Sequence, residues 1–170
     1  MPTLTPYTPA HFAALSALQL PAAQEQFTAY PADLIPETEA DADSLGVTIL
    51  ADIGLDGEAP VGYFVLSAGA QRDKYLPEPD PAGVAIRALS IDERCQGRGI
   101  GTAAMEAVPE LVRAHFPQAE YVFLVVNARN AHARRVYEKA GYAVWFGRDG
   151  GKAGPQWVMR RELAGASALE

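Results

Sequence analysis

Three closely spaced glycines, Gly97, Gly99 and Gly101, constrain this 170-residue chain more than any other feature. They directly follow a run with β-strand character over residues 83–91 and precede a helical pattern that begins near Thr102. Glycine has no Cβ, so such a backbone can turn its N–H groups toward an anion and let the anion approach closely. The N-terminus of the following helix adds unpaired N–H groups and about half a positive charge. The junction therefore predicts an anion site between strand and helix, and a diphosphate suits it best.

Composition predicts a globular protein of one domain. The apolar fraction of 49% and the charged fraction of 21% are ordinary for a folded chain of this length. We expect the domain to cover residues 1–163, with a C-terminal tail over residues 164–170 that is left out of the fold. The net charge of −7 argues against a nucleic-acid partner, because phosphate contacts need clustered Lys and Arg.

The remaining class signals predict a cytoplasmic protein with no membrane segment and no metal. No apolar run approaches the roughly 20 residues that a membrane span needs, and no signal-peptide pattern is visible. Cys95 stands alone, which excludes an intrachain disulfide or a cysteine-based zinc site. The histidines His11, His115 and His132 are too scattered along the chain to suggest metal ligands.

Hydrophobic spacing and turn residues predict the elements of the N-terminal half. Helices are expected from Thr8–Pro9 to Pro21, over residues 22–30 and over residues 37–45. Two strands follow, joined by a hairpin loop over residues 54–58, and residues 71–82 form a proline-rich loop. The expected buried faces are Phe12, Leu15 and Leu18 in the first helix, Val47, Ile49, Ala51 and Ile53 in the first strand, and Val61, Tyr63 and Val65 in the second.

The C-terminal half is expected to alternate strands and helices before a closing antiparallel pair. The strand over residues 83–91 leads into a helix over residues 102–115, which Pro109 should bend near Met105. A strand over residues 121–126 and a helix from Asn130 follow. The closing strands cover residues 142–148 and 156–163, and their aromatic residues Trp145, Phe146 and Trp157 either fill the core or form a homodimer surface.

A second motif accompanies the glycine loop. The helix after the strand at 121–126 carries Asn130, Ala133, Tyr137, Gly141 and Tyr142 at the spacing Asn-x-x-Ala-x-x-x-Tyr-x-x-x-Gly-aromatic. With Gln96, Gly99 and Gly101 in the loop, this order of motifs resembles the GCN5-related N-acetyltransferase (GNAT) superfamily over residues 45–163. Shorter matches around residues 24–27, 86–92 and 103–105 resemble spermine/spermidine-type acetyltransferases.

The resemblance implies a fold, a cofactor and a reaction. The fold is α/β (α+β), a mixed, mostly antiparallel, twisted sheet of about seven strands with helices on both faces. The activity is transfer of an acetyl group from acetyl-coenzyme A to a primary amine of a small molecule, by direct attack on the thioester and without a metal. The implied cofactor-binding residues are Leu89, Ile91, Gln96, Gly97, Arg98, Gly99, Ile100, Gly101, Thr102 and Asn130.

Two other nucleotide sites fit the glycine loop less well. A dinucleotide-binding loop follows the first strand of a parallel sheet and needs an acidic residue at the end of the next strand, where this chain has Val126-Asn127. A nucleoside-triphosphate loop needs Gly-Lys-Ser/Thr after its second glycine, and that is missing. A plain strand-to-helix turn is the remaining alternative for the loop taken without the Asn130 motif.

For catalysis, the resemblance makes Tyr137 the acid that protonates the leaving thiolate, with core packing as its alternative role. Making a lysine-like amine neutral at pH 7 costs roughly 4.6 kcal/mol, so a base or a water chain must accept its proton. The family often places a glutamate on the strand before the loop, but Arg87, Ala88 and Ser90 offer no carboxylate. Glu93 is therefore the candidate base, beside Asp92; either can equally be a solvated loop residue.

The acceptor region contains an acidic set that suits a polyamine. Phe27, Glu37, Glu39 and Asp41 lie where this superfamily forms its acceptor pocket, although an exposed acidic helix start explains the charges equally well. Two further hypotheses stay open: transfer to a peptide or protein amine, and a non-catalytic acyl-coenzyme A sensor or partner-binding domain.

Overall fold

The computed structural model describes residues 2–22, 29–54 and 57–163 of the chain. Its centre is a seven-stranded sheet in the order β1-β2-β3-β4-β5-β7-β6, in which only β4 and β5 are parallel. This confirms the expected mixed, mostly antiparallel fold. The strands are β1 (Thr3–Pro6), β2 (Ser44–Asp52), β3 (Glu58–Ser67), β4 (Gly83–Ile91), β5 (Tyr121–Asn127), β6 (Ala143–Asp149) and β7 (Pro155–Glu162).

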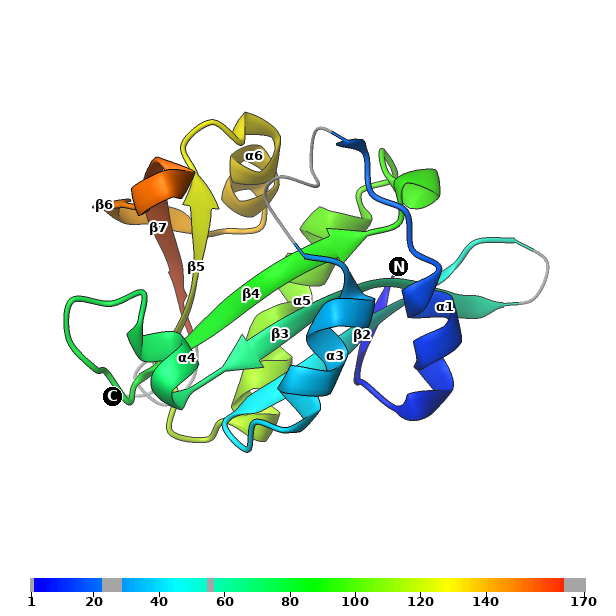
Figure 1. Cartoon of the computed structure of the whole chain (residues 1–170), viewed down its shortest axis with the longest axis horizontal. Helices are drawn as coiled ribbons and strands as arrows, with labels where there is room; N and C mark the ends of the chain where they lie inside the picture. Colours follow the sequence, from blue (N-terminus) through cyan, green and yellow to red (C-terminus); the bar gives the residue numbers. More distant parts are fainter. Residues whose placement is uncertain (1, 23–28, 55–56, 164–170) are drawn as a thin grey trace.

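Helices cover both faces of the sheet (Figure 1). On one face, α5 (Ile100–His115) packs on the main core, and α6 (Ala131–Lys139) contacts α5. The opposite face carries α1 (Phe12–Ser16), α3 (Pro31–Glu39) and α4 (Gly69–Asp73). Short 3₁₀ turns complete the order at η1 (Pro9–His11), η2 (Glu93–Cys95) and η3 (Gly151–Ala153).

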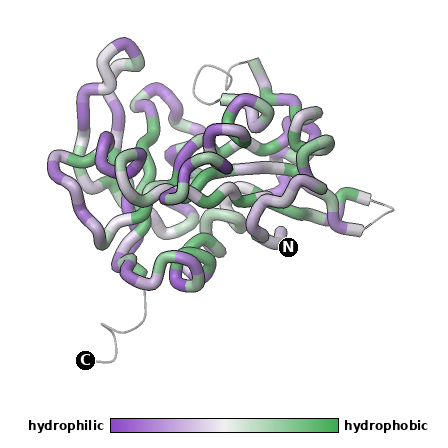
Figure 2. Tube along the Cα trace, turned by 60° about the horizontal axis from the view of Figure 1, so that its bottom comes forward, coloured by the Kyte–Doolittle hydropathy of each residue, from purple (hydrophilic) through white to green (hydrophobic). Residues whose placement is uncertain are grey.

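The core follows the central strands, where hydrophobic residues concentrate (Figure 2). α5 contributes its buried side chains to this core at helical spacing: Ile100, Ala104, Met105, Val108 and Val112. No helix in the described residues is both long and apolar enough to cross a lipid bilayer. Within the same residues, no three His, Cys, Asp or Glu side chains gather in an arrangement that could hold a metal ion.

The parallel pairing of β4 and β5 is short, and this opens the sheet. It extends only from Gly83–Tyr121 to Ile86–Leu124. Just beyond, Ala88 takes a positive φ of 55°, and the register between β3 and β4 shifts. An alanine at positive φ marks a β-bulge, which bends its strand away from the previous direction. As a result, the second half of β4 separates from β5.

The first expected helix is shorter than its hydrophobic spacing predicted. It consists of η1 and α1 and ends at Ser16, and Phe12 is 41% exposed instead of buried. Leu18 and Leu20 are both buried, although positions two apart lie on different faces of a helix. A continuous helix could not bury both leucines on one face, and α1 ends at Ser16, before them. The helix expected at 22–30 lies mostly outside the described residues.

The third expected helix is shifted toward the N-terminus. α3 begins at Pro31, a favoured first helical residue, and ends at Glu39. Asp41 then forms a turn, accepting hydrogen bonds from the Asp43 N–H at 3.0 Å and the Ser44 hydroxyl at 2.8 Å. The prediction of 37–45 missed the Tyr30–Pro31 start signal and placed a helix where this turn and the start of β2 lie.

The β2–β3 hairpin is present, but its faces are not regular. Val61 packs in the main core beneath α5, whereas Tyr63 and Val65 pack on the opposite face with α1 and α3. A register shift opposite Ile49 and Leu50 inserts one residue into β3 and turns Val61 over. Ile53 lies beyond the end of β2 and is 47% exposed. Simple alternation predicted neither result.

Pro109 lies inside α5, and a side chain from outside the helix bonds the carbonyl that this proline leaves unpaired. Proline has no N–H, so the carbonyl of Met105, four residues earlier, loses its helical partner. The hydroxyl of the buried Tyr142 donates a hydrogen bond to that oxygen at 3.0 Å. The helix continues through Pro109 to His115, and Tyr142 thereby ties α5 to the segment after α6.

Tyr142→Phe is expected to lower the free energy of unfolding by about 1–3 kcal/mol, because it leaves a buried carbonyl without a donor. In a Pro109→Ala background the new N–H at position 109 can bond to Met105, so the same change should cost about 1 kcal/mol less. Urea denaturation of the four proteins in this double-mutant cycle measures the difference. If the two substitutions changed the free energy of unfolding in a strictly additive way, the Tyr142 hydroxyl would not be compensating for the N–H that Pro109 lacks.

Candidate functional site

A cleft of about 370 Å³ opens where β4 and β5 separate. The second half of β4 and the glycine loop form one wall, and β5 with α6 forms the other. Among the expected cofactor residues, the cleft is lined by Leu89, Ile91, Gln96, Gly97, Gly99, Ile100, Gly101, Thr102 and Asn130. The structure thus brings nine of the ten together. Arg98 is exposed and is not among the lining residues.

The glycine loop has the backbone shape that an anion cradle needs. Gly97 and Gly99 have φ angles of 80° and 76°, in the left-handed region that side chains disfavour, and Gly99 is the N-cap of α5. The N-terminus of this 16-residue helix points its first N–H groups toward the cleft mouth. The loop and the helix N-terminus therefore place partial positive backbone charge at an accessible surface, where an anion can bind.

Two side chains fix the loop and the facing helix. The Gln96 amide donates to the backbone oxygen of Ile91 at 3.0 Å, which ties the loop to the end of β4. Asn130 caps α6, accepting the N–H of Ala133 at 3.1 Å. Its side-chain oxygen is therefore used in capping, while its position still lines the cleft.

Tyr137 lies in the cleft wall on α6, beside Val136 and Ala133. Its ring also meets Tyr142 edge-on, with centroids 6.4 Å apart, so packing and cleft lining coexist. Burial raises the pKa of the Tyr137 hydroxyl to about 12. This makes Tyr137 a poor donor of a free proton and a good donor of a hydrogen bond near neutral pH.

The candidate bases do not reach the cleft. Glu93 is exposed on η2, its N–H bonds the oxygen of Gln19 at 2.7 Å, and it lines neither of the clefts described here. Asp92 is buried, and Arg94 holds its carboxylate through contacts of 2.9 and 2.5 Å. The Arg94 guanidinium holds the pKa of Asp92 below its usual value. The structure therefore does not bring Glu93 to the cleft that Tyr137 lines.

A second cleft of about 250 Å³ opens on the opposite face of the same gap. Ala85 and Phe123 line it, and they alternate along their strands with Ile86 and Leu124 of the first cleft. Four residues line both clefts: Ile86, Ala88, Leu124 and Val125. The two clefts thus meet at the point where the strands part.

The acidic residues expected to bind an acceptor are not at this second cleft. Glu37 and Glu39 lie in the last turn of α3, and Asp41 holds its own turn. The side chains that line the second cleft in the described part of the chain include no carboxylate. Phe27 lies outside the described residues. The expectation for Glu37, Glu39 and Asp41 came from the resemblance, and none of them lines this cleft.

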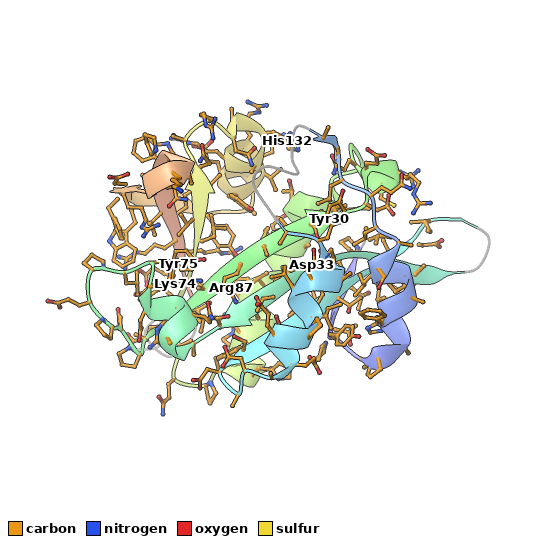
Figure 3. The ribbon with its side chains drawn as sticks, viewed as in Figure 1. Tyr30, Asp33, Lys74, Tyr75, Arg87 and His132 are labelled. Carbon is orange, nitrogen blue, oxygen red and sulfur yellow. The ribbon has the colours of Figure 1, made fainter. Side chains whose placement is uncertain are left out.

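Several lining residues escaped the sequence analysis. In the first cleft these are the exposed His132 and Lys139 of α6 and the β5 residues Val125 and Asn127 (Figure 3 labels His132). The motif that contains Asn130 and Tyr137 could have predicted His132 and Lys139. Residues 132, 136 and 139 share one face of the helix, because they are spaced four and three residues apart, and this face lies next to the one that carries Tyr137. In the second cleft, Tyr75, Arg87 and Gln156 come from three separate strands or loops and carried no shared signal.

The comparisons with known proteins agree with this geometry. The sequence profile of the Acetyltransferase (GNAT) family matches residues 12–142. A mycothiol acetyltransferase of Beutenbergia cavernae is 37% identical over 68 residues, which cover 40% of this chain. That match spans only 22% of the relative's own length.

Solved structures share the fold over nearly the whole chain. An aminoglycoside acetyltransferase in complex with coenzyme A and kanamycin superposes with a TM-score of 0.74, at 22% identity, covering 95% of each chain. A spermidine N-acetyltransferase chimera from Vibrio cholerae gives a TM-score of 0.66 at 12% identity, again covering 95% of each chain. At these identities the similarity is one of fold.

Proposed function

The chain belongs to the acetyltransferase (GNAT) family, and from this membership we propose that it transfers the acetyl group of acetyl-coenzyme A to a primary amine of a small molecule. The observation that carries the proposal is the first cleft, where the glycine loop, the N-terminus of α5 and Tyr137 surround one space between separated strands. Solved relatives that share the fold bind coenzyme A or acetyl-coenzyme A.

In this proposal the glycine loop holds the diphosphate of the cofactor. The N–H groups of residues 97–102 supply the donors, and the loop shape at Gly97 and Gly99 leaves room beside them. The pantetheine arm lies along Leu89 and Ile91, where β4 has no neighbouring strand on the β5 side. The thioester then reaches the end of the cleft shared with the second opening.

The reaction is a direct transfer. The amine nitrogen bonds to the thioester carbonyl carbon and forms a tetrahedral oxyanion, and a backbone N–H of β4 stabilises that oxygen. The carbon–sulfur bond then breaks. One proton leaves the nitrogen, one reaches the sulfur, and the products are an amide and the free thiol of coenzyme A. Tyr137 donates its hydrogen bond to the departing sulfur.

A polyamine acceptor is the finer version suggested by the short sequence matches. It would need carboxylates facing the second cleft, and the described residues that line this cleft provide none. Polyamines therefore serve as one arm of the test, and the charge around the second cleft favours another class of amine. A homodimer through the β6 edge, where Trp145 is 38% exposed, is a further proposal that analytical ultracentrifugation tests.

The decisive experiment combines binding and turnover. Calorimetry with coenzyme A should show one site, and a thiol-release assay with acetyl-coenzyme A and a broad panel of amines should show acetylation of at least one of them. Binding without any acetylation would favour an acyl-coenzyme A sensor. Absence of coenzyme A binding by folded protein would remove the proposal.

The pH dependence of the rate should reflect the amine and not Tyr137. Because burial raises the pKa of Tyr137 to about 12, its hydroxyl stays protonated through the assay range and is lost only above that range. We expect kcat/KM to rise as the amine loses its proton, with no decline up to about pH 10. Initial rates from about pH 6 to 10 check this. A decline near pH 9 in the wild type that Tyr137→Phe abolishes would contradict it.

A further inference from the structure

Arg87 is the main charged side chain of the second cleft. It lies on β4 two residues after Ala85 and so faces the same side of the sheet. Figure 3 shows it between the end of α4, near Lys74 and Tyr75, and the start of α3, near Tyr30 and Asp33. Arg87 thus lines the opening through which an acceptor would reach the thioester, and its Nη1 atom is directed to Ser67 on β3.

The guanidinium of Arg87 is only partly satisfied. One terminal nitrogen, Nη1, donates to the Ser67 hydroxyl at 3.3 Å. The Nε atom is buried and has no hydrogen-bond partner among the described residues. Within the same residues, no carboxylate forms an ion pair with Arg87. A buried donor left unpaired is costly, and the acceptors of the described residues do not fully satisfy this guanidinium.

The surroundings of Arg87 hold two further cations, and the carboxylates of Asp33 and Asp41 belong to the segment on its α3 side. Arg148 and Lys74 both lie over the ring of Tyr75, with distances of 5.6 and 5.2 Å to its centroid. Asp41 is near enough that Arg87 contributes to lowering its pKa, although its turn contributes more. The Asp41 carboxylate already accepts from Asp43 and Ser44. The cleft therefore suits an anionic group on the acceptor.

We propose that the second cleft binds an α-amino acid, and that Arg87 pairs with its carboxylate; the inference rests on the proposed acetyltransferase function. A guanidinium presents a planar pair of N–H donors that matches a carboxylate. The α-amine is separated from that carboxylate by a single carbon. Pairing at Arg87 thus holds the amine near Ile86 and Ala88, the residues common to both clefts.

This substrate class also reduces the need for a carboxylate base, which the described residues that line the second cleft do not provide. An α-amine without a charged neighbour has a pKa of about 7.7–8.0, against about 10.4 for a lysine amine. In a free amino acid the carboxylate raises that value, and pairing with Arg87 cancels the increase. Neutralising such an amine at pH 7 costs roughly 1.4 kcal/mol, against about 4.6 kcal/mol for a lysine-like amine. Water can then accept the proton.

Matched acceptor pairs test the carboxylate directly. The protein is assayed by thiol release with the common amino acids, with the C-terminal amides of those it accepts, and with spermidine and spermine. We expect kcat/KM for the acid to exceed that for its amide by about 10-fold or more, the loss typical of an unpaired buried charge. The amide has the less basic amine, so a preference for the acid must come from binding.

Substitution at Arg87 assigns the effect to one side chain. Arg87→Gln should raise KM for the acid by about 10-fold with little change for the amide, and Arg87→Lys should retain part of the binding. Arg135→Gln removes an exposed arginine on α6 that lines neither cleft and should change nothing. Unchanged coenzyme A affinity shows that each variant is folded.

The outcomes separate the two proposals. Acetylation of amides or polyamines but not of amino acids overturns the inference and leaves the acetyltransferase function standing. A preference for acids that Arg87→Gln does not alter also overturns the role of Arg87. Failure of every amine overturns both proposals.

Discussion

Tyr137→Phe is expected to lower kcat by about 10²-fold, the loss typical when one hydrogen-bond donor to a developing negative charge is removed, with coenzyme A affinity unchanged. The Tyr137 hydroxyl has a pKa of about 12. Full transfer of its proton to a thiolate, whose conjugate thiol has a pKa near 8.5, would be uphill by roughly 5 kcal/mol at 1.36 per unit. The hydroxyl therefore acts by a hydrogen bond that strengthens as negative charge develops on sulfur, and its loss affects the transition state more than binding.

Steady-state rates at saturating amine, together with calorimetry for coenzyme A, measure this split. Tyr7→Phe is the matched control, since Tyr7 packs with the residues around α1 and lines neither cleft. It should leave kcat unchanged. Undiminished turnover in Tyr137→Phe would remove the hydroxyl from the reaction and leave Tyr137 a packing residue.

Gly99→Val is expected to weaken coenzyme A binding by at least about 10-fold, equivalent to 1.4 kcal/mol. The φ of 76° at Gly99 is strained for any side chain and most strained for a β-branched one, by about 1–2 kcal/mol or more. Space is not the cause, because among the described residues no atom outside the local backbone lies within 4 Å of a Cβ at this position. The loop must rotate to relieve the strain, and its N–H groups then lose their common direction.

Gly57→Val provides a control with the same backbone strain. Gly57 has a φ of 79° and equally open surroundings, but it lies in the β2–β3 hairpin, away from both clefts. Both variants should lose similar stability in urea denaturation. Only Gly99→Val should lose affinity for coenzyme A by calorimetry. Equal affinity in both variants would show that the loop shape is not needed for the diphosphate.

The sequence predicted best those parts of the fold that depend on adjacent residues. The strand, the glycine loop and the start of α5 follow one another directly, so their signals could be read together. The helices before β2 were misplaced because the burial of Leu18 and Leu20 and the start of α3 at Pro31 outweighed local hydrophobic spacing. The inserted residue at Val61 depends on pairing with β2, which periodicity within β3 does not reveal.

The two clefts also differed in how well the sequence predicted their residues. Most of the first cleft comes from two motifs with fixed spacing, and the structure gathers those residues as expected. The second cleft combines residues from five separate segments, including Ala29, Tyr75, Arg87, Phe123 and Gln156. No spacing rule joins positions so far apart. The resemblance placed acidic residues of α3 at the acceptor pocket, whereas the described residues that line the second cleft include Arg87 and no carboxylate.

The two clefts open on opposite faces of one sheet, so the acetyl donor and the amine can bind in either order. In the proposed reaction the donor and the acceptor enter by separate routes, so neither blocks the entrance of the other. We therefore expect a ternary complex and no acetylated protein intermediate. A single molecule that joins coenzyme A to an amine through a short linker would pass between β4 and β5 and occupy both routes at once.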